Sequence, residues 1–327
     1  MKHVLFCAAF ILNSWAGIES AVAGPFSGMV VFGDSLSDVG NVQQRTTQLP
    51  LLTPPIPGPY YFNGRFSNGL NYADVLSQGL GLGPLTHSLA GGDDFAYGGA
   101  RTTGTPSPNS IVVQDVDDQV SLYLAAHSPA AGELFVVCAG ADDLLDLLAA
   151  NQTNVAPSVS SLGASLTRLY NAGAREFLVL NVPGLGATPG LNGDPLAAAA
   201  ANSLTLQFNT ALSLSLDTLE ATEPGLIIHR FDVAGFFDDV LADPAAFGLT
   251  NVIDSAAPGL EPGAQAYDVN LIAPNVDQYL FWDDLHPTAA AHALLGQQIL
   301  AVVPEPTSLL FLGFGGVWVI AGRRKGR

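Results

Sequence analysis

The sequence predicts an α/β fold in which helices cover both faces of a doubly wound, parallel sheet. Four short apolar segments are typical of buried strands, and they lie at residues 29–32, 133–140, 176–182 and 226–231. Patterns typical of helices alternate with them or follow them, at residues 71–80, 116–126, 159–172, 196–220 and 288–302. Strands that are apolar on both faces and alternate with helices form parallel sheets with helices on either side. The ligand site of such a sheet lies beyond the carboxyl ends of its strands.

The first 23 residues predict a secretory signal peptide. They combine Lys2, an apolar run at residues 4–12 and small residues that end in Ala21-Val22-Ala23. This order of charge, apolar core and cleavage site is typical of exported proteins. We therefore expect the mature chain to begin near Gly24, with one large domain over residues 24–303.

Residues 304–327 predict a sorting or anchoring segment. Pro304-Glu305-Pro306 precedes an apolar stretch at 309–321, and basic residues follow at 323–325. The stretch is shorter than the about 20 apolar residues that a spanning helix needs. This ending resembles the PEP-CTERM sorting signal of Gram-negative bacteria that make exopolysaccharide. The resemblance implies cleavage by an exosortase and a location at the cell surface, in the extracellular matrix or in the medium. An ordinary membrane anchor is the alternative.

Acidic side chains dominate the expected domain. Residues 24–303 contain 27 Asp and Glu against six Arg and no Lys, which gives a net charge of −21. Such a surface repels nucleic acid and anionic lipid, so we expect no nucleic-acid partner and membrane contact only through the C-terminal segment. Cys138 is the only cysteine after the signal peptide, and it excludes a disulfide framework. No HExxH or CxxC motif occurs, so no metal site is predicted.

Two segments at opposite ends of the domain carry groups suited to nucleophilic catalysis. Ser35 directly follows the first predicted strand, where a turn would expose its hydroxyl. Alternatively, Ser35 or Ser37 caps the next helix. Asp283 stands three residues before His286. A serine nucleophile needs a base, and that base needs a carboxylate that fixes its tautomer, so one tight loop carrying Asp283 and His286 could activate Ser35.

Five sequence blocks resemble the SGNH/GDSL hydrolases, especially the bacterial GDSL lipases and esterases. They are FGDSLSDVGN, NGRFSNGLNYADVL, FAYGGA, CAGADD and YLFWDDLHPTAAAH, and they follow the family's order from Phe32 to His292. The resemblance implies a flavodoxin-like three-layer α/β/α sandwich with a central parallel sheet. It also implies hydrolysis of esters through an acyl-serine, without a cofactor. The G-x-S-x-G motif of the α/β-hydrolases is absent around Ser35.

The resemblance also implies a role for each matching residue. Ser35 would be the nucleophile and His286 the general base and then acid. Asp283 would orient His286, because the family pattern Asp-x-x-His selects it over its neighbour Asp284.

The family's oxyanion hole uses the N–H of the serine, the N–H of a glycine and an asparagine side chain. The first two correspond to Ser35 and Gly99, with Gly98 as the alternative register. The third position departs from the family, because the chain has Asp142 in place of the asparagine. An ionised carboxylate would repel a developing oxyanion, and losing one such donor costs about 10²–10³ in kcat. A carboxyl group kept protonated by burial could still donate one hydrogen bond.

Three functions are compatible with these residues. The first is an exported esterase or lipase for short acyl esters, lipid esters or the O-acyl groups of a polysaccharide. The second is a catalytically impaired surface or matrix protein, because Asp142 replaces the expected asparagine. The third is acyl transfer to an acceptor other than water, which uses the same residues.

Two segments are predicted to select the substrate. The proline-rich residues 42–68 are expected to form a loop without helix or strand, at the rim of the site or over it. Residues 254–277 are the second segment. Tyr60, Tyr61, Phe62 and Phe66 either line an acyl pocket or pack this loop onto the domain.

Overall fold

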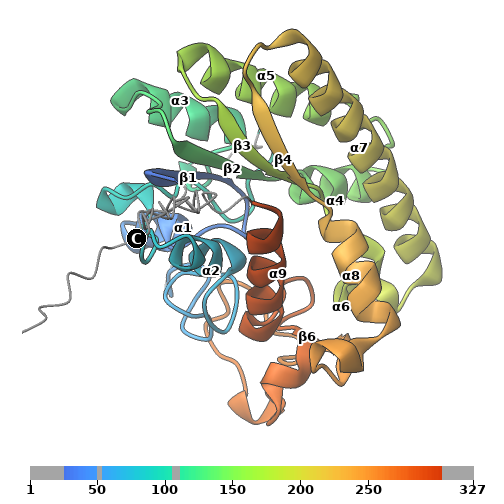
Figure 1. Ribbon diagram of the computed structural model, residues 1–327. Coiled ribbons are helices and arrows are strands. Elements are labelled where there is room, and N and C mark those ends of the chain that lie inside the picture. Colours follow the sequence, from blue (N-terminus) through green and yellow to red (C-terminus); the bar gives the residue numbers. More distant parts are fainter. Residues whose placement is uncertain (1–25, 50–53, 105–110, 304–327) are drawn as a thin grey trace, which may run out of the picture.

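The computed structural model of the protein describes residues 26–49, 54–104 and 111–303. The signal peptide predicted at 1–23 and the sorting segment predicted at 304–327 lie outside these residues. Within them, strands alternate with helices in the order that the sequence predicts (Figure 1). No helix in the described ranges has both the length and the apolar character needed to cross a bilayer.

Four parallel strands form the central sheet, in the order β1-β2-β3-β4 (Figure 1). They are β1 (Gly28–Gly33), β2 (Glu133–Cys138), β3 (Glu176–Leu180) and β4 (Ile227–Phe231). Each coincides with one of the predicted apolar segments. Three of the four are buried along almost their whole length, which explains why their sequences are apolar at consecutive positions.

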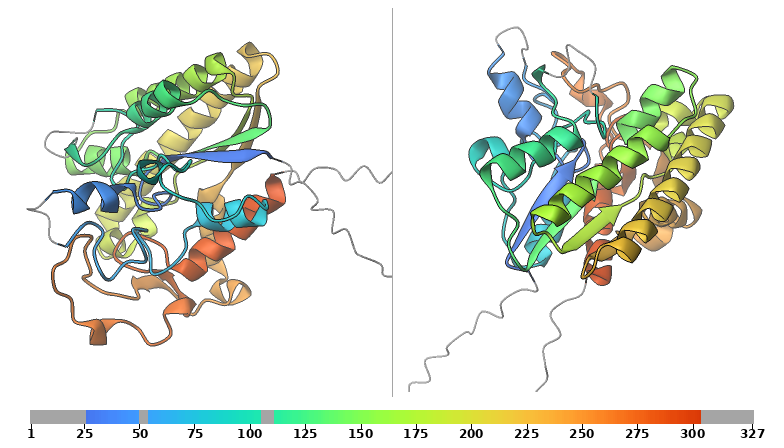
Figure 2. Two further views of the ribbon diagram at one scale, coloured as in Figure 1. Left: turned by 90° about the vertical axis from the view of Figure 1, so that its left-hand side faces the viewer. Right: turned by 90° about the horizontal axis from the view of Figure 1, so that it is seen from above.

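Helices cover both faces of this sheet and make three layers (Figures 1 and 2). Phe32, Phe135 and Phe177 point to one face and pack in one core with helices α3 (Val116–Ala126), α4 (Ala141–Ala149), α5 (Ala156–Ala172) and α7 (Pro195–Thr222). Val31, Val136 and Leu178 point to the other face and pack with α2 (Tyr72–Gly79), α8 (Val233–Ala242) and α9 (Ala289–Val302). The predicted three-layer α/β/α fold is confirmed.

Residues 93–97 extend the sheet on the other side of β1. The N–H of Val31 donates to the carbonyl of Asp93 at 3.0 Å, and the N–H of Phe95 donates back to the carbonyl of Val31 at 2.8 Å. The N–H of Tyr97 donates to the carbonyl of Gly33 at 3.1 Å. Therefore β1 lies between residues 93–97 and β2, where the chain connections leave in opposite directions. A crevice forms at such a point beyond the carboxyl ends of the strands.

Several short elements were not predicted. They are α1 (Asn41–Thr47), α4, α6 (Pro189–Asn192), α8 and the parallel pair β5 (Asn251–Ser255) and β6 (Tyr279–Phe281). The prediction that residues 42–68 contain no helix is wrong at their start, because α1 extends to Thr47. This helix is supported by the carboxylate of Asp38, which accepts the N–H groups of Asn41 and Val42 at 2.7 and 3.2 Å. Such first-turn N–H groups have no partner within a helix.

Candidate active site

Ser35 lies in the turn that follows β1, at the carboxyl edge of the sheet. The turn is closed by hydrogen bonds from the N–H groups of Ser37 and Asp38 to the carbonyl of Asp34, at 3.1 and 3.0 Å. The side chain of Ser35 caps no helix, since α1 begins six residues later and has no side-chain cap. Its Oγ lies instead 2.9 Å from Nε2 of His286.

His286 and Asp283 lie on one tight loop after β6. The loop is closed by the N–H of Trp282, which donates to the carbonyl of His286 at 2.7 Å. Nδ1 of His286 lies 2.8 Å from Oδ2 of Asp283. An ionised carboxylate only accepts hydrogen bonds, so Nδ1 carries the proton and Nε2 presents its lone pair to the hydroxyl of Ser35.

Asp283 and His286 shift each other's pKa although both are buried. Burial by itself would raise the pKa of Asp283, but the charge of His286 and the hydrogen bonds that Asp283 accepts lower this pKa below its ordinary value. Burial would likewise lower the pKa of His286, but the attraction of Asp283 raises it above its ordinary value. Asp283 is thus held ionised, and His286 is a stronger base than a free imidazole.

The structure discriminates between the two neighbouring aspartates. Asp283 accepts the backbone N–H groups of Leu285 and His286 on Oδ1, at 2.8 and 2.6 Å. The carboxylate of Asp284 accepts the hydroxyl of Ser255 at 3.2 Å instead. It is Asp283 that the fold places against His286.

Tyr61 is a site residue whose contact sequence reasoning missed. Its phenol donates a hydrogen bond of 2.7 Å to Oδ2 of Asp283, the oxygen that also accepts Nδ1 of His286. The sequence singled out Tyr61 only as an apolar residue of the proline-rich loop. The sequence carries no signal for this contact, because the burial that makes the hydroxyl need a hydrogen-bond partner is visible only in the folded chain.

The structure separates the two glycine registers of the expected oxyanion hole. The N–H of Gly98 donates to Oδ2 of Asp38 at 2.9 Å and is therefore already engaged. Gly99 has a φ of 82°, a left-handed conformation that favours glycine, and its carbonyl accepts Nη1 of Arg101 at 2.9 Å. Both glycines line the same cavity as Ser35, but the N–H of Gly98 is engaged by Asp38, so the N–H of Gly99 is the better candidate donor.

Asp142 lies at the start of α4 and lines the same cavity as Ser35 and His286. Burial, reinforced by the nearby carboxyl group of Asp34, raises the pKa of Asp142 to about 8, although Arg101 and His286 act in the opposite direction. This shift favours the protonated form of the side chain at neutral pH. A neutral carboxyl group can donate one hydrogen bond, as the expected asparagine would.

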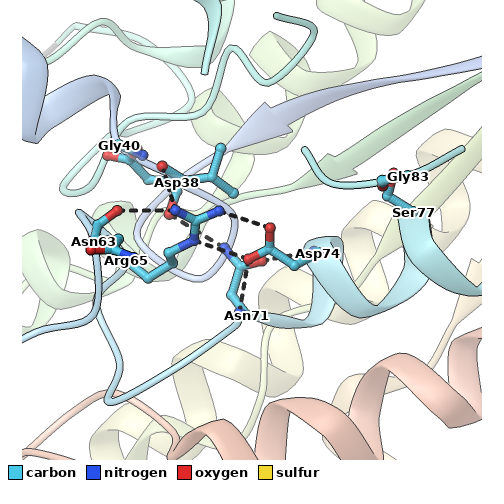
Figure 3. Close-up of polar contacts among 9 residues, drawn as sticks. Asp38, Gly40, Asn63, Arg65, Asn71, Asp74, Ser77 and Gly83 are labelled. Carbon is cyan, nitrogen blue, oxygen red and sulfur yellow. Dashed lines mark hydrogen bonds and ion pairs between the residues drawn. The ribbon is translucent and has the colours of Figure 1, made fainter. Parts of the chain in front are cut away.

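The segment between Ser35 and α2 is fixed by buried ionic groups. Arg65 makes a two-point ion pair with Asp74, through bonds of 2.8 and 3.0 Å, and donates to the carbonyl of Val39 at 3.0 Å (Figure 3). Asn71 donates to the carbonyl of Asp38 at 3.3 Å and caps α2 (Figure 3). These contacts tie the GDSL block to the NGRFSNG block of the sequence.

A cavity of about 870 Å³ opens beside Ser35 and His286. Its wall is apolar over most of its extent, formed by Val42, Leu49, Ile56, Phe66, Ile111, Val112, Val113, Leu260 and Pro262. Phe66 is the part of this wall next to the reactive residues, because its ring centre lies 5.3 Å from that of His286. Of the four aromatic residues considered from sequence, Phe66 lines this cavity; Tyr60 and Tyr61 pack the loop, and Phe62 is exposed.

The comparisons with known proteins agree with this architecture. Residues 29–299 match the family of GDSL-like lipases and acylhydrolases, and residues 302–325 match the PEP-CTERM protein-sorting motif. A GDSL esterase/lipase of Arabidopsis thaliana is 29% identical over 89% of this chain and 84% of its own length. The phosphatidylcholine-sterol acyltransferase of Aeromonas hydrophila is 25% identical over 86% of this chain and 91% of its own length.

Among solved structures, the acetylxylan esterase Axe2 of Geobacillus stearothermophilus is similar to this chain. That enzyme is 14% identical and has a TM-score of 0.45, with 85% of this chain and 94% of its own covered. The family match extends over most of the sequence, from β1 to α9, and includes Ser35, Asp283 and His286. This chain belongs to the GDSL-like lipase/acylhydrolase family.

Proposed function

We propose that this protein is an exported ester hydrolase that acts through an acyl-serine at Ser35. The observation that carries the proposal is the unbroken chain of hydrogen bonds from Ser35 through His286 to Asp283, with distances of 2.9 and 2.8 Å. His286 takes the hydroxyl proton on Nε2 while Oγ attacks the ester carbonyl carbon. Asp283 stabilises the imidazolium that forms.

In the remaining steps each proton is again carried by Nε2 of His286. The tetrahedral intermediate collapses as its C–O bond breaks, and Nε2–H of His286 protonates the departing alcohol. The acyl group now resides on Ser35. A water molecule then gives a proton to Nε2 and attacks the acyl carbon, and a second collapse returns the proton to Oγ and releases the acid.

Three donors are proposed to stabilise the oxyanion. They are the N–H groups of Ser35 and Gly99 and the protonated carboxyl group of Asp142, which replaces the family's asparagine. The raised pKa of Asp142 supports this assignment, because the donor is present at neutral pH. This argues against the alternative in which Asp142 makes the protein an inactive member of the fold.

The cavity favours esters with an apolar acyl chain longer than acetyl. Its volume of about 870 Å³ lies in the range of ligand pockets, about 300–1,000 Å³. A methyl group built on Gly99 would lie 3.8 Å from Cγ2 of Val113, so the apolar wall begins next to the proposed oxyanion donor. An acyl chain bound to Ser35 would pass Phe66 and Val113 and leave the alcohol portion toward Glu261 and Asp284.

The C-terminal sequence supports export and surface sorting. The PEP-CTERM motif at residues 302–325 supports processing by an exosortase of a Gram-negative bacterium. The signal peptide proposed for residues 1–23 would direct the chain out of the cytoplasm. We propose the cell surface or the extracellular matrix as its location.

Hydrolysis of p-nitrophenyl acetate, butyrate and octanoate by the purified protein tests the proposal. Ser35→Ala should reduce the rates to background. Ser27→Ala, on the exposed segment before β1, is the matched control and should keep full activity. Activity that survives in Ser35→Ala would refute the proposed nucleophile. A folded wild-type protein that cleaves none of the esters would favour the impaired-enzyme alternative.

Acyl transfer to an alcohol is the second candidate function. It is favoured by the apolar cavity and by the similarity to an acyltransferase of Aeromonas hydrophila. Adding a long-chain alcohol to the octanoate reaction would distinguish the two, since transfer produces an ester and hydrolysis produces free octanoate.

A further inference from the structure

We propose that Tyr61 is a positioning residue that holds the carboxylate of Asp283 against His286 and tunes the basicity of that imidazole. Its effect on catalysis rests on the proposed function, but its effect on the imidazole does not. The proposal starts from one contact, the hydrogen bond of 2.7 Å from the Tyr61 phenol to Oδ2 of Asp283.

This contact differs from the other donors to the carboxylate. The N–H groups of Leu285 and His286 and the Nδ1–H group of His286 all belong to the same short loop as Asp283. The phenol comes from 222 residues earlier in the chain. Gly190, Ala257 and Ser67 also hold this loop, but through its backbone carbonyls. Tyr61 is therefore the donor from outside the loop that holds the carboxylate of Asp283 itself.

The phenol is itself held in place from several directions. Tyr61 is 6% exposed and packs in a small core with Leu260 and Trp282. Its N–H donates to the carbonyl of Gly58 at 3.3 Å, and its ring lies 6.3 Å from that of Phe66. A residue so packed keeps its hydroxyl at a fixed point, which is what positioning requires.

The protonation state of the Tyr61 phenol decides whether it raises or lowers the pKa of His286. Burial and the adjacent Asp283 raise the pKa of Tyr61 far above its ordinary value, so the group is a neutral donor at every working pH. The positive end of its O–H dipole points at the carboxylate of Asp283. It makes the electrostatic potential at His286 less negative, so the imidazole attracts a proton less strongly. Removing the hydroxyl should therefore raise the pKa of His286.

Other groups also act on His286. Asp283 and Glu261 favour its protonated form, and Asp142 does so where it is ionised. Burial lowers the pKa of the nearby His292 to about 3, so that imidazole stays neutral. Tyr61→Phe replaces none of these side chains and removes only the hydrogen bond to Asp283, so a pKa shift of His286 in the variant reports the loss of that contact.

Tyr61→Phe is the direct test, because phenylalanine keeps the ring and removes only the hydroxyl. We expect kcat to fall about tenfold with KM within about twofold, since a hydrogen bond to a charged group contributes on this scale. The ascending limb of the profile of kcat/KM against pH, which reports the base of the free enzyme, should move up by about half a pH unit or more.

Tyr60→Phe is the matched control. The Tyr60 hydroxyl lies in the same loop but accepts the backbone N–H of Tyr267, at 3.0 Å, and does not contact Asp283. This variant should keep the pH profile and kcat of the wild type. Equal profiles in the two variants would overturn the proposal and leave Tyr61 with a packing role only.

An NMR titration of the His286 imidazole separates this inference from the proposed function. It needs no turnover, so it remains informative if the protein cleaves no ester. The pKa of His286 should be higher in Tyr61→Phe than in the wild type and in Tyr60→Phe. An unchanged or lower pKa in a folded Tyr61→Phe protein would overturn the inference, whatever the esterase assay shows.

Discussion

Oδ2 of Asp38 accepts a hydrogen bond of 2.9 Å from the backbone N–H of Gly98, which is 60 residues further along the chain. The same carboxylate accepts the N–H groups of Gly40, Asn41 and Val42. One buried side chain thus connects the turn of Ser35, the start of α1 and the segment that carries Gly99. The relative placement of the nucleophile and the candidate oxyanion donor depends on this connection.

Asp38→Asn should impair both stability and activity. The amide offers one acceptor oxygen in place of two. At least one of the N–H groups that donate to Asp38 therefore loses its partner in the protein interior. A buried unsatisfied group costs about 1–3 kcal/mol, which thermal or denaturant unfolding would measure. We expect kcat to fall by about tenfold or more as Gly99 shifts.

Asp117→Asn provides the control for Asp38→Asn. Asp117 is half-buried, and its carboxylate accepts the hydroxyl of Thr103 and the N–H of Asp118. Its replacement should change neither the unfolding free energy nor kcat by much. A wild-type unfolding midpoint in Asp38→Asn would contradict the connecting role of Asp38.

The raised pKa of Asp142 predicts an upper limit to the pH range of activity. Its folded pKa is about 8, and the proposed donor exists only in the protonated form. Activity should therefore decline as the pH rises through about 8, and it should decline on the acidic side when His286 becomes protonated. Asp142→Asn should remove the alkaline decline, because an amide donates at every pH. Rates of ester hydrolysis between pH 5 and pH 10, by wild type and variant, would measure this.

Linkage gives Asp142→Asn a second expected effect. The carboxyl group is protonated in the native state up to about pH 8, whereas in the unfolded chain it ionises near its reference pKa of about 3.9. Its contribution to wild-type stability is therefore fully present below about pH 4 and is lost as the pH rises to about 8. The variant should gain stability relative to the wild type across this window. An identical alkaline limb and identical stability in the two proteins would refute a protonated Asp142.

Much of the fold was predictable from the sequence because the central strands are buried on both faces. Their consecutive apolar residues stand out from the helical patterns, and β1 to β4 all coincide with such runs. The short β5 was not predictable in this way, since two of its five residues are exposed. For α1 the deciding interaction is the support of Asp38, three residues before the helix, rather than a periodic apolar face.

The candidate site was predictable only where chemistry and local spacing coincide. Asp283 and His286 are three residues apart, and their pairing with Ser35 follows from what a serine nucleophile needs. The contact of Tyr61 with Asp283 joins residues 222 positions apart and has no local pattern. The sequence alone shows that Asp142 replaces the family's asparagine. The burial that raises the pKa of Asp142 exists only in the folded chain.

Gly98→Ala should destabilise the site through one contact. A methyl group at this position would lie 2.2 Å from ring carbons of Phe66, which is far inside van der Waals contact. Overpacking of this kind costs about 1–3 kcal/mol, measurable as a lower unfolding midpoint. The displaced Phe66 ring, which neighbours His286, should also lower kcat.

A second substitution tests that explanation of Gly98→Ala. Adding Phe66→Leu shortens the side chain that meets the methyl group, so the double variant should lose less stability than the two single losses combined. Gly193→Ala is the control, because a methyl group there meets nothing within 4 Å. Additive losses in the double variant would show that Phe66 is not the cause.

Val113→Phe should change which acyl chains are accepted. Val113 lines the apolar wall close to Gly99, and a phenyl group there would take up space that a long acyl chain needs. Hydrophobic pockets discriminate by about 10–200-fold for small changes in the fitted group. We expect the ratio of kcat/KM for octanoate to that for acetate to fall by about tenfold or more, because the acetyl group ends before it reaches position 113. Val269→Phe, at a surface position that is 56% exposed, should leave the ratio unchanged. An equal loss of activity on both esters in Val113→Phe would show that this residue supports the oxyanion segment instead of binding the acyl chain.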